Sequence, residues 1–146
     1  MSMAVFRMNG QKAQHIQFQI GDETYAVAIS DIREIIRMQE IREIPGVASY
    51  VRGVIHLRGS IVPVVSLRLL FGKRETEPGK QTRIIIVNHR SGTVGLIVDK
   101  VDSVVTFSDI QPPPEQTGST AGVRFIGIGI LRDALVGILK LDQVLI

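Results

Sequence analysis

Apolar and polar residues alternate along this chain in short segments that are separated by turn residues. Residues 15–20, HIQFQI, alternate with a period of two, and after the turn residues GDE the pattern resumes in TYAVAI. A period of two places successive side chains on opposite faces of a strand, so these segments predict a β-hairpin. Three later hairpins are predicted in the same way: 53–65 turning near Gly59, 83–98 turning near residues 91–92, and 127–141 turning near Asp133.

Three short stretches depart from this alternation and predict brief helices. In SDIREII, residues 30–36, either Ser30 or Asp31 can cap a helix. Glu34 then lies in its first turn and projects outward, while the isoleucines face the core or a groove. The other two predicted helices are GVASYVRG, residues 46–53, and SLRLLFG, residues 66–72, which ends at a glycine.

Two polar stretches and one proline interrupt the strand pattern. Residues 72–81, GKRETEPGKQ, are charged and contain Pro-Gly, and they predict an exposed connection between two halves of the chain. Residues 109–122 carry three consecutive prolines followed by small polar residues, and they predict an extended, mobile segment and not a strand. Pro63 stands inside a strand-like run, where its missing N–H predicts an edge strand or a bulge.

The two halves of the chain resemble each other. At an offset of 69 residues, 25–36 fall on 94–105, and at an offset of 74, 53–67 fall on 127–141 with several identities. Regularly spaced short strands favour small barrels or a sandwich. The repeat predicts a tandem duplication of a β unit of about 65 to 75 residues. Because each unit is too small to bury much core alone, the two should pack together.

The differences between the halves are as informative as the matches. Glu34 falls opposite Ser103, and Gly59 falls opposite Asp133. A site that combines Glu34 with the Arg58-Gly59 turn would therefore exist in the first half only. If the short helix lies over the first barrel, Glu34 could reach Arg58.

Composition predicts a folded, soluble protein of one ordinary domain or two very small ones. The 146 residues are 45% hydrophobic and 21% charged, and they include no cysteine. The longest apolar runs stop at four or five residues, far below the roughly 18 that span a bilayer. The first residues also lack the apolar stretch of a secretory signal.

A net charge of +3 raises the possibility of a nucleic-acid partner. The basic residues, however, are spread through predicted loops and strands and form no basic run. With two Tyr, five Phe and no Trp, the chain also has little material for stacking bases. An OB-like nucleic-acid binder remains a remote alternative.

No motif for catalysis, for a metal or for a cofactor stands out. His15, His56 and His89 are far apart and have no ligand spacing, and there is neither a G-x-S-x-G elbow nor a phosphate-binding G-x-x-x-x-G-K. The carboxylates are interpreted as solvated loop charges, with Glu34 as the exception. An enzyme is therefore the least favoured class, and no cofactor is expected.

Residues 51–72, VRGVIHLRGSIVPVVSLRLLFG, closely resemble the signature of the CheW family of chemotaxis coupling proteins, in which a Gly-Val-x-Asn-Leu-Arg-Gly-x-Ile-x-Pro-Val-x-Asp-Leu-Arg pattern is usual. The segments FQIGDETYAVAISDIREI, VGLIVDKVDSVV and FIGIGILRDALVGILKLDQVL are similar to the family's other hairpins. The resemblance runs from about Gln14 to the last residue, in four ordered segments.

This resemblance implies an all-β fold of two small, intertwined five-stranded barrels, SH3-like or OB-like, with strands exchanged between the halves. It places a CheW-like domain at 14–146, with a first repeat at about 14–72 and a second at about 82–146. Residues 1–13 are then expected to be a flexible N-terminus.

The resemblance also implies a non-enzymatic, cytoplasmic adaptor that is recruited to membrane receptor arrays without inserting into the membrane. It would couple the cytoplasmic tips of chemoreceptors (methyl-accepting chemotaxis proteins) to the regulatory domain of the histidine kinase CheA, and so regulate flagellar motility. The positions that match receptor-contacting residues are Ile32, Glu34, Gly53, Arg58 and Val104. Those that match the kinase-facing side are Thr82 and Gly95.

Two positions depart from the family pattern: His56 stands where Asn is usual, and Ser66 where Asp is usual. The first changes a polar side chain next to the turn, and the second keeps a residue that can cap a helix. Coupling in a pilus-type or other chemosensory pathway is an alternative that these residues do not separate from flagellar chemotaxis.

Overall fold

The computed structural model describes residues 13–89, 92–112 and 125–141, and most of these residues lie in β-strands. The elements in chain order are β1 (Gln14–Ile20), β2 (Glu23–Ala28), the 3-10 helix η1 (Ile29–Asp31), β3 (Ile32–Arg37), β4 (Val51–Leu57), β5 (Ser60–Ser66), α2 (Leu67–Leu70), β6 (Arg83–His89), β7 (Gly92–Val98), β8 (Lys100–Thr106), β9 (Asp109–Gln111), β10 (Phe125–Leu131) and β11 (Ala134–Leu139). No helix among these residues is long and apolar enough to cross a membrane.

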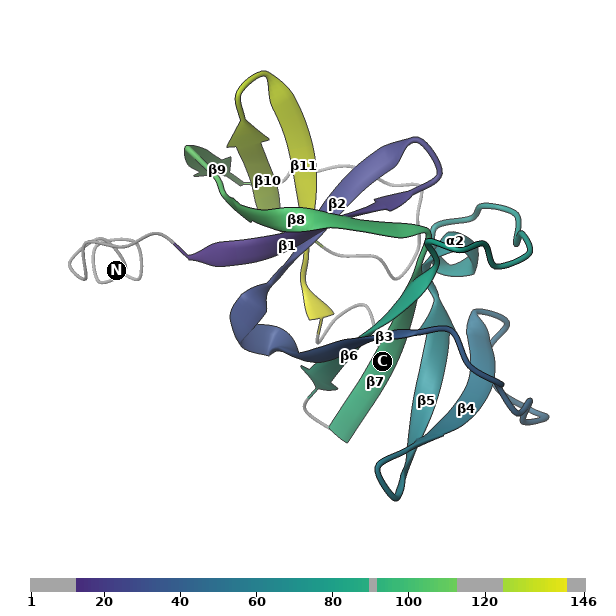
Figure 1. Cartoon of the computed structure of the whole chain (residues 1–146). Coiled ribbons are helices and arrows are strands. Elements are labelled where there is room, and N and C mark those ends of the chain that lie inside the picture. Colours follow the sequence, from purple (N-terminus) through teal and green to yellow (C-terminus); the bar gives the residue numbers. More distant parts are fainter. Residues whose placement is uncertain (1–12, 90–91, 113–124, 142–146) are drawn as a thin grey trace.

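The strands form two sheets, and each sheet takes strands from both halves of the chain (Figure 1). We call them sheet A, in the order β8-β1-β2-β11-β10-β9, and sheet B, in the order β3-β6-β7-β5-β4. The parallel pairs β2 with β11 and β5 with β7 join strands of the two halves. The predicted all-β fold with exchanged strands is therefore confirmed.

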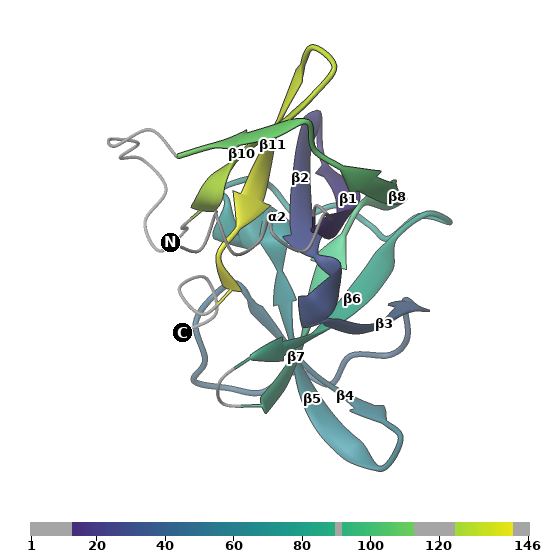
Figure 2. The same cartoon turned by 90° about the vertical axis from the view of Figure 1, so that its left-hand side faces the viewer.

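The internal duplication is visible in the strand order. Replacing β3, β6, β7, β5 and β4 of sheet B by their counterparts in the other half gives β8-β1-β2-β11-β10, which is the order of the first five strands of sheet A. The hairpins β4–β5 and β10–β11 are counterparts, and they extend from opposite ends of the molecule (Figure 2).

The largest core cluster lies between the sheets, because it contains residues of both: Phe18, Ile20 and Val27 from sheet A pack with Val65, Ile85 and Leu96 from sheet B. Smaller clusters belong to sheet B alone and to sheet A alone. Strand β6 takes part in two of them, with Ile85 and Val87 in the central cluster and Ile84 and Ile86 in the cluster of sheet B. Burial on both faces explains its unbroken apolar run.

All four predicted hairpins are present as antiparallel pairs. The second turns at Arg58 and Gly59, with φ of 51° and 82°. Positive φ at both central residues is the geometry of a tight type I′ turn, which matches the right-handed twist of the flanking strands.

The helix predictions are confirmed in one case of three. Residues 30–36 were expected to be helical, but η1 ends at Asp31 and β3 follows. Residues 46–53 form turns and then β4. The third helix is present as α2, and the Ser66 Oγ accepts a hydrogen bond from Leu69 N at 3.1 Å, so serine does cap it.

Other local predictions have mixed outcomes. Residues 72–81 form no strand or helix and are largely exposed, as expected of a connection. Pro63 lies in the internal strand β5, but pairing with β7 begins only at Val64, so at the proline the strand has a partner on one side. The start of segment 109–122 was expected not to be a strand, yet β9 pairs with β10. Residues 113–122 of that segment, and residues 1–12, lie outside the described residues.

Candidate partner-binding site

An ion pair joins the two residues that the sequence singled out. Glu34 lies on β3, an edge strand of sheet B, and Arg58 lies in the β4–β5 turn. The Arg58 Nε donates to Glu34 Oε2 at 3.0 Å, and Nη2 donates to Oε1 at 2.8 Å. The predicted contact is therefore present, although Glu34 reaches the arginine from a strand and not from a helix. Two parallel N–H···O bonds fix the guanidinium plane as well as its position.

The pair is open to solvent mainly on the arginine side, where 75% of the side chain is exposed against 26% for Glu34. The hydrogen bond from Arg58 holds the pKa of Glu34 below its usual range, and the same bond raises the pKa of Arg58. Both groups therefore stay charged at neutral pH. The outer edge of the guanidinium is accessible to a partner.

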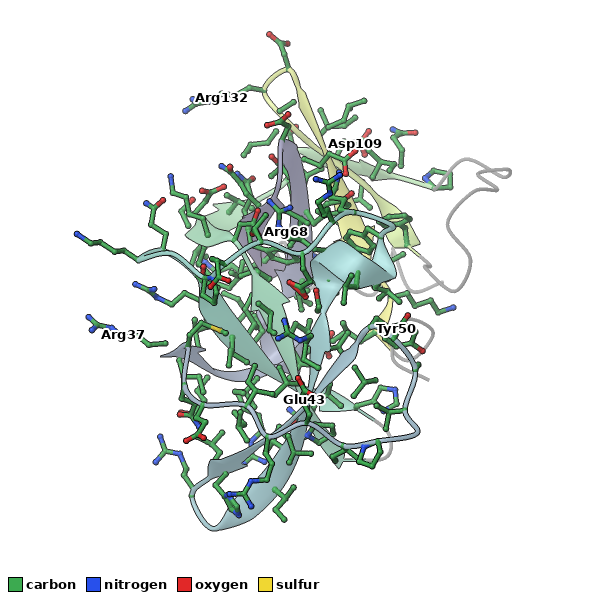
Figure 3. All side chains as sticks on the ribbon, turned by 90° about the vertical axis from the view of Figure 1, so that its right-hand side faces the viewer. Arg37, Glu43, Tyr50, Arg68, Asp109 and Arg132 are labelled. Atoms are coloured by element: carbon green, nitrogen blue, oxygen red, sulfur yellow. The ribbon has the colours of Figure 1, made fainter. Side chains whose placement is uncertain are left out.

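The second half of the chain has the arginine but lacks the carboxylate. Arg132 lies at the tip of the β10–β11 hairpin, with a φ of 60° that resembles the 51° of Arg58 (Figure 3). Ser103 stands on β8 at the position that Glu34 has on β3. The Glu34–Arg58 pair is thus specific to one end of the molecule.

The other expected receptor contacts differ in how accessible they are. Ile32 begins β3, two residues before Glu34, and is partly buried against the central core cluster. Val104 is 50% exposed on β8, the edge strand of sheet A. Ile35, which was expected to face a core or groove, is 36% exposed.

Gly53 is buried, although it was expected to contact a receptor. A Cβ at this position would lie 2.2 Å from the main-chain oxygen of Arg42. The backbone of the segment after β3 therefore lies directly over Gly53, between it and any partner on that side.

The two expected kinase contacts also differ. Thr82 is half-buried just before β6, where its Oγ1 accepts a hydrogen bond from Gly79 N at 2.8 Å. Gly95 is buried in β7, between β5 and β6, and a Cβ there would lie 2.7 Å from Ile84 Cγ2. A substitution at Gly95 would act first on the packing of the sheet.

His56, which departs from the family pattern, is exposed on β4 and faces a small hollow. Its main-chain oxygen accepts a hydrogen bond from Gln39 Nε2 at 3.1 Å. The residues that line the hollow are Gln39, Glu40, Arg42, Val54, Ile55 and His56. Two of these lining residues are apolar, and the other four, which we call the polar rim, include one acid and one base.

Sequence reasoning missed a second bidentate pair, between Arg68 of α2 and Asp99. The Arg68 Nε and Nη2 donate to the two carboxylate oxygens at 2.9 and 2.7 Å. The only sequence signal was the place of Arg68 in the Leu-Arg ending of the signature segment. Its partner is a single aspartate 31 residues away.

The described residues contain no group of three or more His, Asp or Glu side chains that could hold a metal ion. The features that stand out in this part of the chain are instead an exposed charged pair, a polar hollow and the edge strands of the two sheets. Such features are suited to protein binding, since charged groups can orient a partner and open strand edges can pair with one.

A duplicated β fold with exchanged strands and an exposed charged rim defines a class of protein-binding modules. Residues 14–146 match the CheW-like domain family. The chain therefore belongs to the CheW-like domain family.

Individual relatives agree with this assignment. The chain is 36% identical over 139 residues to the chemotaxis protein CheW of Helicobacter pylori, covering 94% of this chain and 84% of the relative. It is similar to the crystal structure of the scaffolding protein TtCheW from Thermoanaerobacter tengcongensis, with a TM-score of 0.85, 32% identity and 92% of each chain covered. It is also 31% identical over 105 residues to the protein PilI of Pseudomonas aeruginosa, and this aligned region covers 68% of this chain and 59% of the relative.

Proposed function

We propose that this chain is a non-enzymatic chemotaxis adaptor, which couples the cytoplasmic tips of chemoreceptors to a CheA-type histidine kinase and so regulates flagellar motility. The observation that carries the proposal is the bidentate Glu34–Arg58 pair, held at an exposed hairpin tip in a chain of the CheW-like domain family. An adaptor of this kind needs a shaped, charged surface and no reactive group.

The Glu34–Arg58 pair orders part of the receptor-binding surface before a receptor binds. Glu34 accepts two hydrogen bonds from Arg58, so the guanidinium is already ordered before a partner arrives, and little side-chain entropy is lost on binding. Ile32 and Val104 would add apolar contact area on the edge strands β3 and β8. Apolar area supplies affinity, and the charged rim sets partner choice.

The kinase would bind a different face, which includes Thr82 and depends on the packing around Gly95. Separate faces allow one molecule to hold receptor and kinase at once. Contacts that are weak individually then gain strength from the clustering of receptors and kinases in an array. We propose that the adaptor acts in the cytoplasm, at receptor arrays on the membrane, with residues 14–146 as one domain.

Co-sedimentation tests the proposal directly. Chemoreceptor signalling fragments from the same organism, displayed on vesicles, should carry the protein into the pellet, and a CheA-type kinase should be recruited only when the protein is present. A protein that stays in the supernatant with receptor and with kinase alike would overturn the proposal.

A second candidate is coupling in a pilus-type chemosensory pathway, which is favoured by the similarity to PilI. The two pathways differ in which receptor and which kinase are bound. Competition between receptor fragments of the flagellar and the pilus systems, at equal concentration, would separate them. Preferential binding of the pilus-system fragment would favour this second candidate.

A further inference from the structure

Gly53 lies where the chain that follows β3 crosses the edge of β4. Arg42 N donates to Val54 O, and Val54 N donates to Arg42 O, both at 2.9 Å. Gly53 has a φ of +145°, and a Cβ would lie 2.2 Å from Arg42 O and 2.8 Å from Arg42 C. Both atoms are backbone, so they cannot move aside cheaply. We call this contact between residues 39–42 and β4 the seam.

The second half has the same crossing, with Gly127 in the place of Gly53. A Cβ on Gly127 would lie 2.6 Å from the main-chain oxygen of Gln111, and Gln111 pairs with Ile128. By the offsets of the duplication, Gln111 corresponds to Arg42 and Ile128 to Val54. The glycine is therefore part of how each unit is built.

The two crossings differ in how completely they are paired. In the second half, β9 pairs with β10 at three successive positions, which include Asp109 with Ile130. In the described residues of the first half, the crossing has one isolated bridge, Arg42 with Val54. The counterparts of Asp109 and Ile130 are Glu40 and His56, and both line the hollow.

Side-chain contacts replace the missing backbone pairs in the first half. Gln39 Nε2 donates to His56 O, and Arg58, two residues after His56, binds Glu34 on β3. The hollow thus lies where Glu40 and His56 are not paired through their backbones, in contrast to their counterparts Asp109 and Ile130. Figure 3 labels Glu43, which directly follows residues 39–42, where the chain passes across sheet B.

We propose that Gly53 is a positioning residue for receptor binding, which holds residues 39–42 against β4 so that Gln39, Glu40 and His56 form a specificity-determining surface beside Arg58. This inference rests on the proposed adaptor function. Gly53 is itself covered by the backbone of Arg42, so it can act on a receptor only through this segment. The polar rim fits hydrogen-bonding or charged side chains of the receptor tip.

The first test compares two matched variants, Gly53→Ala and Gly127→Ala. Each places a methyl group on a crossing backbone, so both should lower the thermal midpoint. Only Gly53→Ala should weaken binding to vesicle-displayed receptor signalling fragments, by roughly tenfold, and speed hydrogen exchange at the Arg42 and Val54 amides. Equal loss of receptor binding in both folded variants would overturn the inference.

The second test does not depend on how well the glycine variants fold. Gln39→Ala and Glu40→Gln change side chains at the rim, and each should weaken receptor binding by roughly threefold or more with little change in thermal midpoint. Receptor binding that is unchanged in both variants would overturn the inference.

A double-mutant cycle then tests whether Gly53 acts through the rim. In the folded protein, Gly53→Ala combined with Glu40→Gln should lose less affinity than the two single losses added together, because both act on the same surface. Fully additive losses would show that Gly53 does not act through this segment. A wild-type protein that binds no receptor fragment would instead refute the adaptor function on which the inference rests.

Discussion

Arg68 and Asp99 form a bidentate pair that ties the two sheets together where the chain passes from one to the other. Arg68 belongs to α2, which follows β5 of sheet B, and Asp99 separates β7 of sheet B from β8 of sheet A. The same carboxylate accepts a hydrogen bond from the backbone N–H of Gly21, in the β1–β2 turn of sheet A, at 2.7 Å. One carboxylate therefore holds three segments where the chain passes between the sheets.

Replacing this carboxylate should destabilise the fold. Asp99→Asn removes the charge from a partly buried group that accepts three hydrogen bonds, so we expect a loss of about 1–3 kcal/mol in the free energy of unfolding. Urea unfolding at neutral pH measures this loss. Arg68→Ala serves as the comparison, and the double variant should lose less than the sum of the single losses. Full additivity would show that the two residues are not coupled.

The same pair predicts a pH dependence. Partial burial opposes ionisation of Asp99, but hydrogen bonds from Arg68 and Gly21 outweigh it and lower the pKa of the carboxyl group. A lowered pKa in the folded state means that the stabilisation is complete above about pH 4. It is lost as the pH falls through the lower folded-state pKa. The acid limb of a stability profile should therefore be less steep in Asp99→Asn than in the wild type, and an identical limb would contradict the assignment.

Arg58→Ala should separate binding from stability. Because the arginine is largely exposed, we expect a nearly unchanged thermal midpoint and a clear loss of receptor co-sedimentation. A large drop in the midpoint would show instead that the arginine is structural.

Exchanging the charges tests whether the receptor contacts Arg58 directly or whether the pair only holds the hairpin to β3. Glu34→Arg combined with Arg58→Glu can re-form an ion pair but places the cation on β3. If the receptor contacts the guanidinium of Arg58 directly, receptor binding should stay low in the double variant. Restored binding would mean that the pair acts only by holding the hairpin to β3.

The Glu34–Arg58 contact could be anticipated because the duplication isolates it. The sequence comparison shows Glu34 opposite Ser103, which marks the pair as a feature of the first half. The sequence comparison could not predict whether Glu34 lies on a helix or on a strand. The isoleucines at 32, 35 and 36 have helical spacing, whereas in the structure a register shift between Ile32 and Glu34 breaks the strand alternation. Residues 32–37 form a strand because they pair with β6, and β6 lies in the other half of the chain.

The sequence did not reveal the roles of Gly53 and Asp99, and strand exchange explains this for Asp99, whose partners lie in the first half of the chain. The neighbours of Gly53 are backbone atoms of Arg42, and those of Asp99 come from α2 and the β1–β2 turn. Neither set follows from local spacing. A glycine under a crossing strand and a glycine at a binding surface look alike in one sequence.

Gly95→Ala should lower kinase binding and stability together. The added methyl group would lie 2.7 Å from Ile84 Cγ2 in the interior of sheet B, and overpacking of this kind costs about 1–3 kcal/mol. Thermal unfolding and kinase co-sedimentation at two temperatures measure the two effects. Thr82→Ala provides a comparison nearer the surface, with a smaller expected shift in midpoint. Loss of kinase binding in Gly95→Ala without any loss of stability would contradict this interpretation.

His15 should make stability fall at mildly acidic pH. Its side chain is only 4% exposed, its ring centroid lies 5.1 Å from that of Phe107, and its Nδ1 has no hydrogen-bond partner. Burial lowers the pKa of His15 and outweighs the influence of the Ala13 backbone and the charge of Asp31, which act in the opposite direction.

A histidine with a lowered pKa in the folded state binds its proton more readily when unfolded, so protons favour unfolding. Stability should begin to fall as the pH drops through about 6.5, with a slope of at most about 1.4 kcal/mol per pH unit, and the fall should level off below the folded-state pKa. His15→Leu introduces an apolar side chain at this position and removes the titrating group. The free energy of unfolding of this variant should change less between pH 7 and 5 than that of the wild type. An equal change in both proteins would show that another group controls the acid sensitivity of the fold.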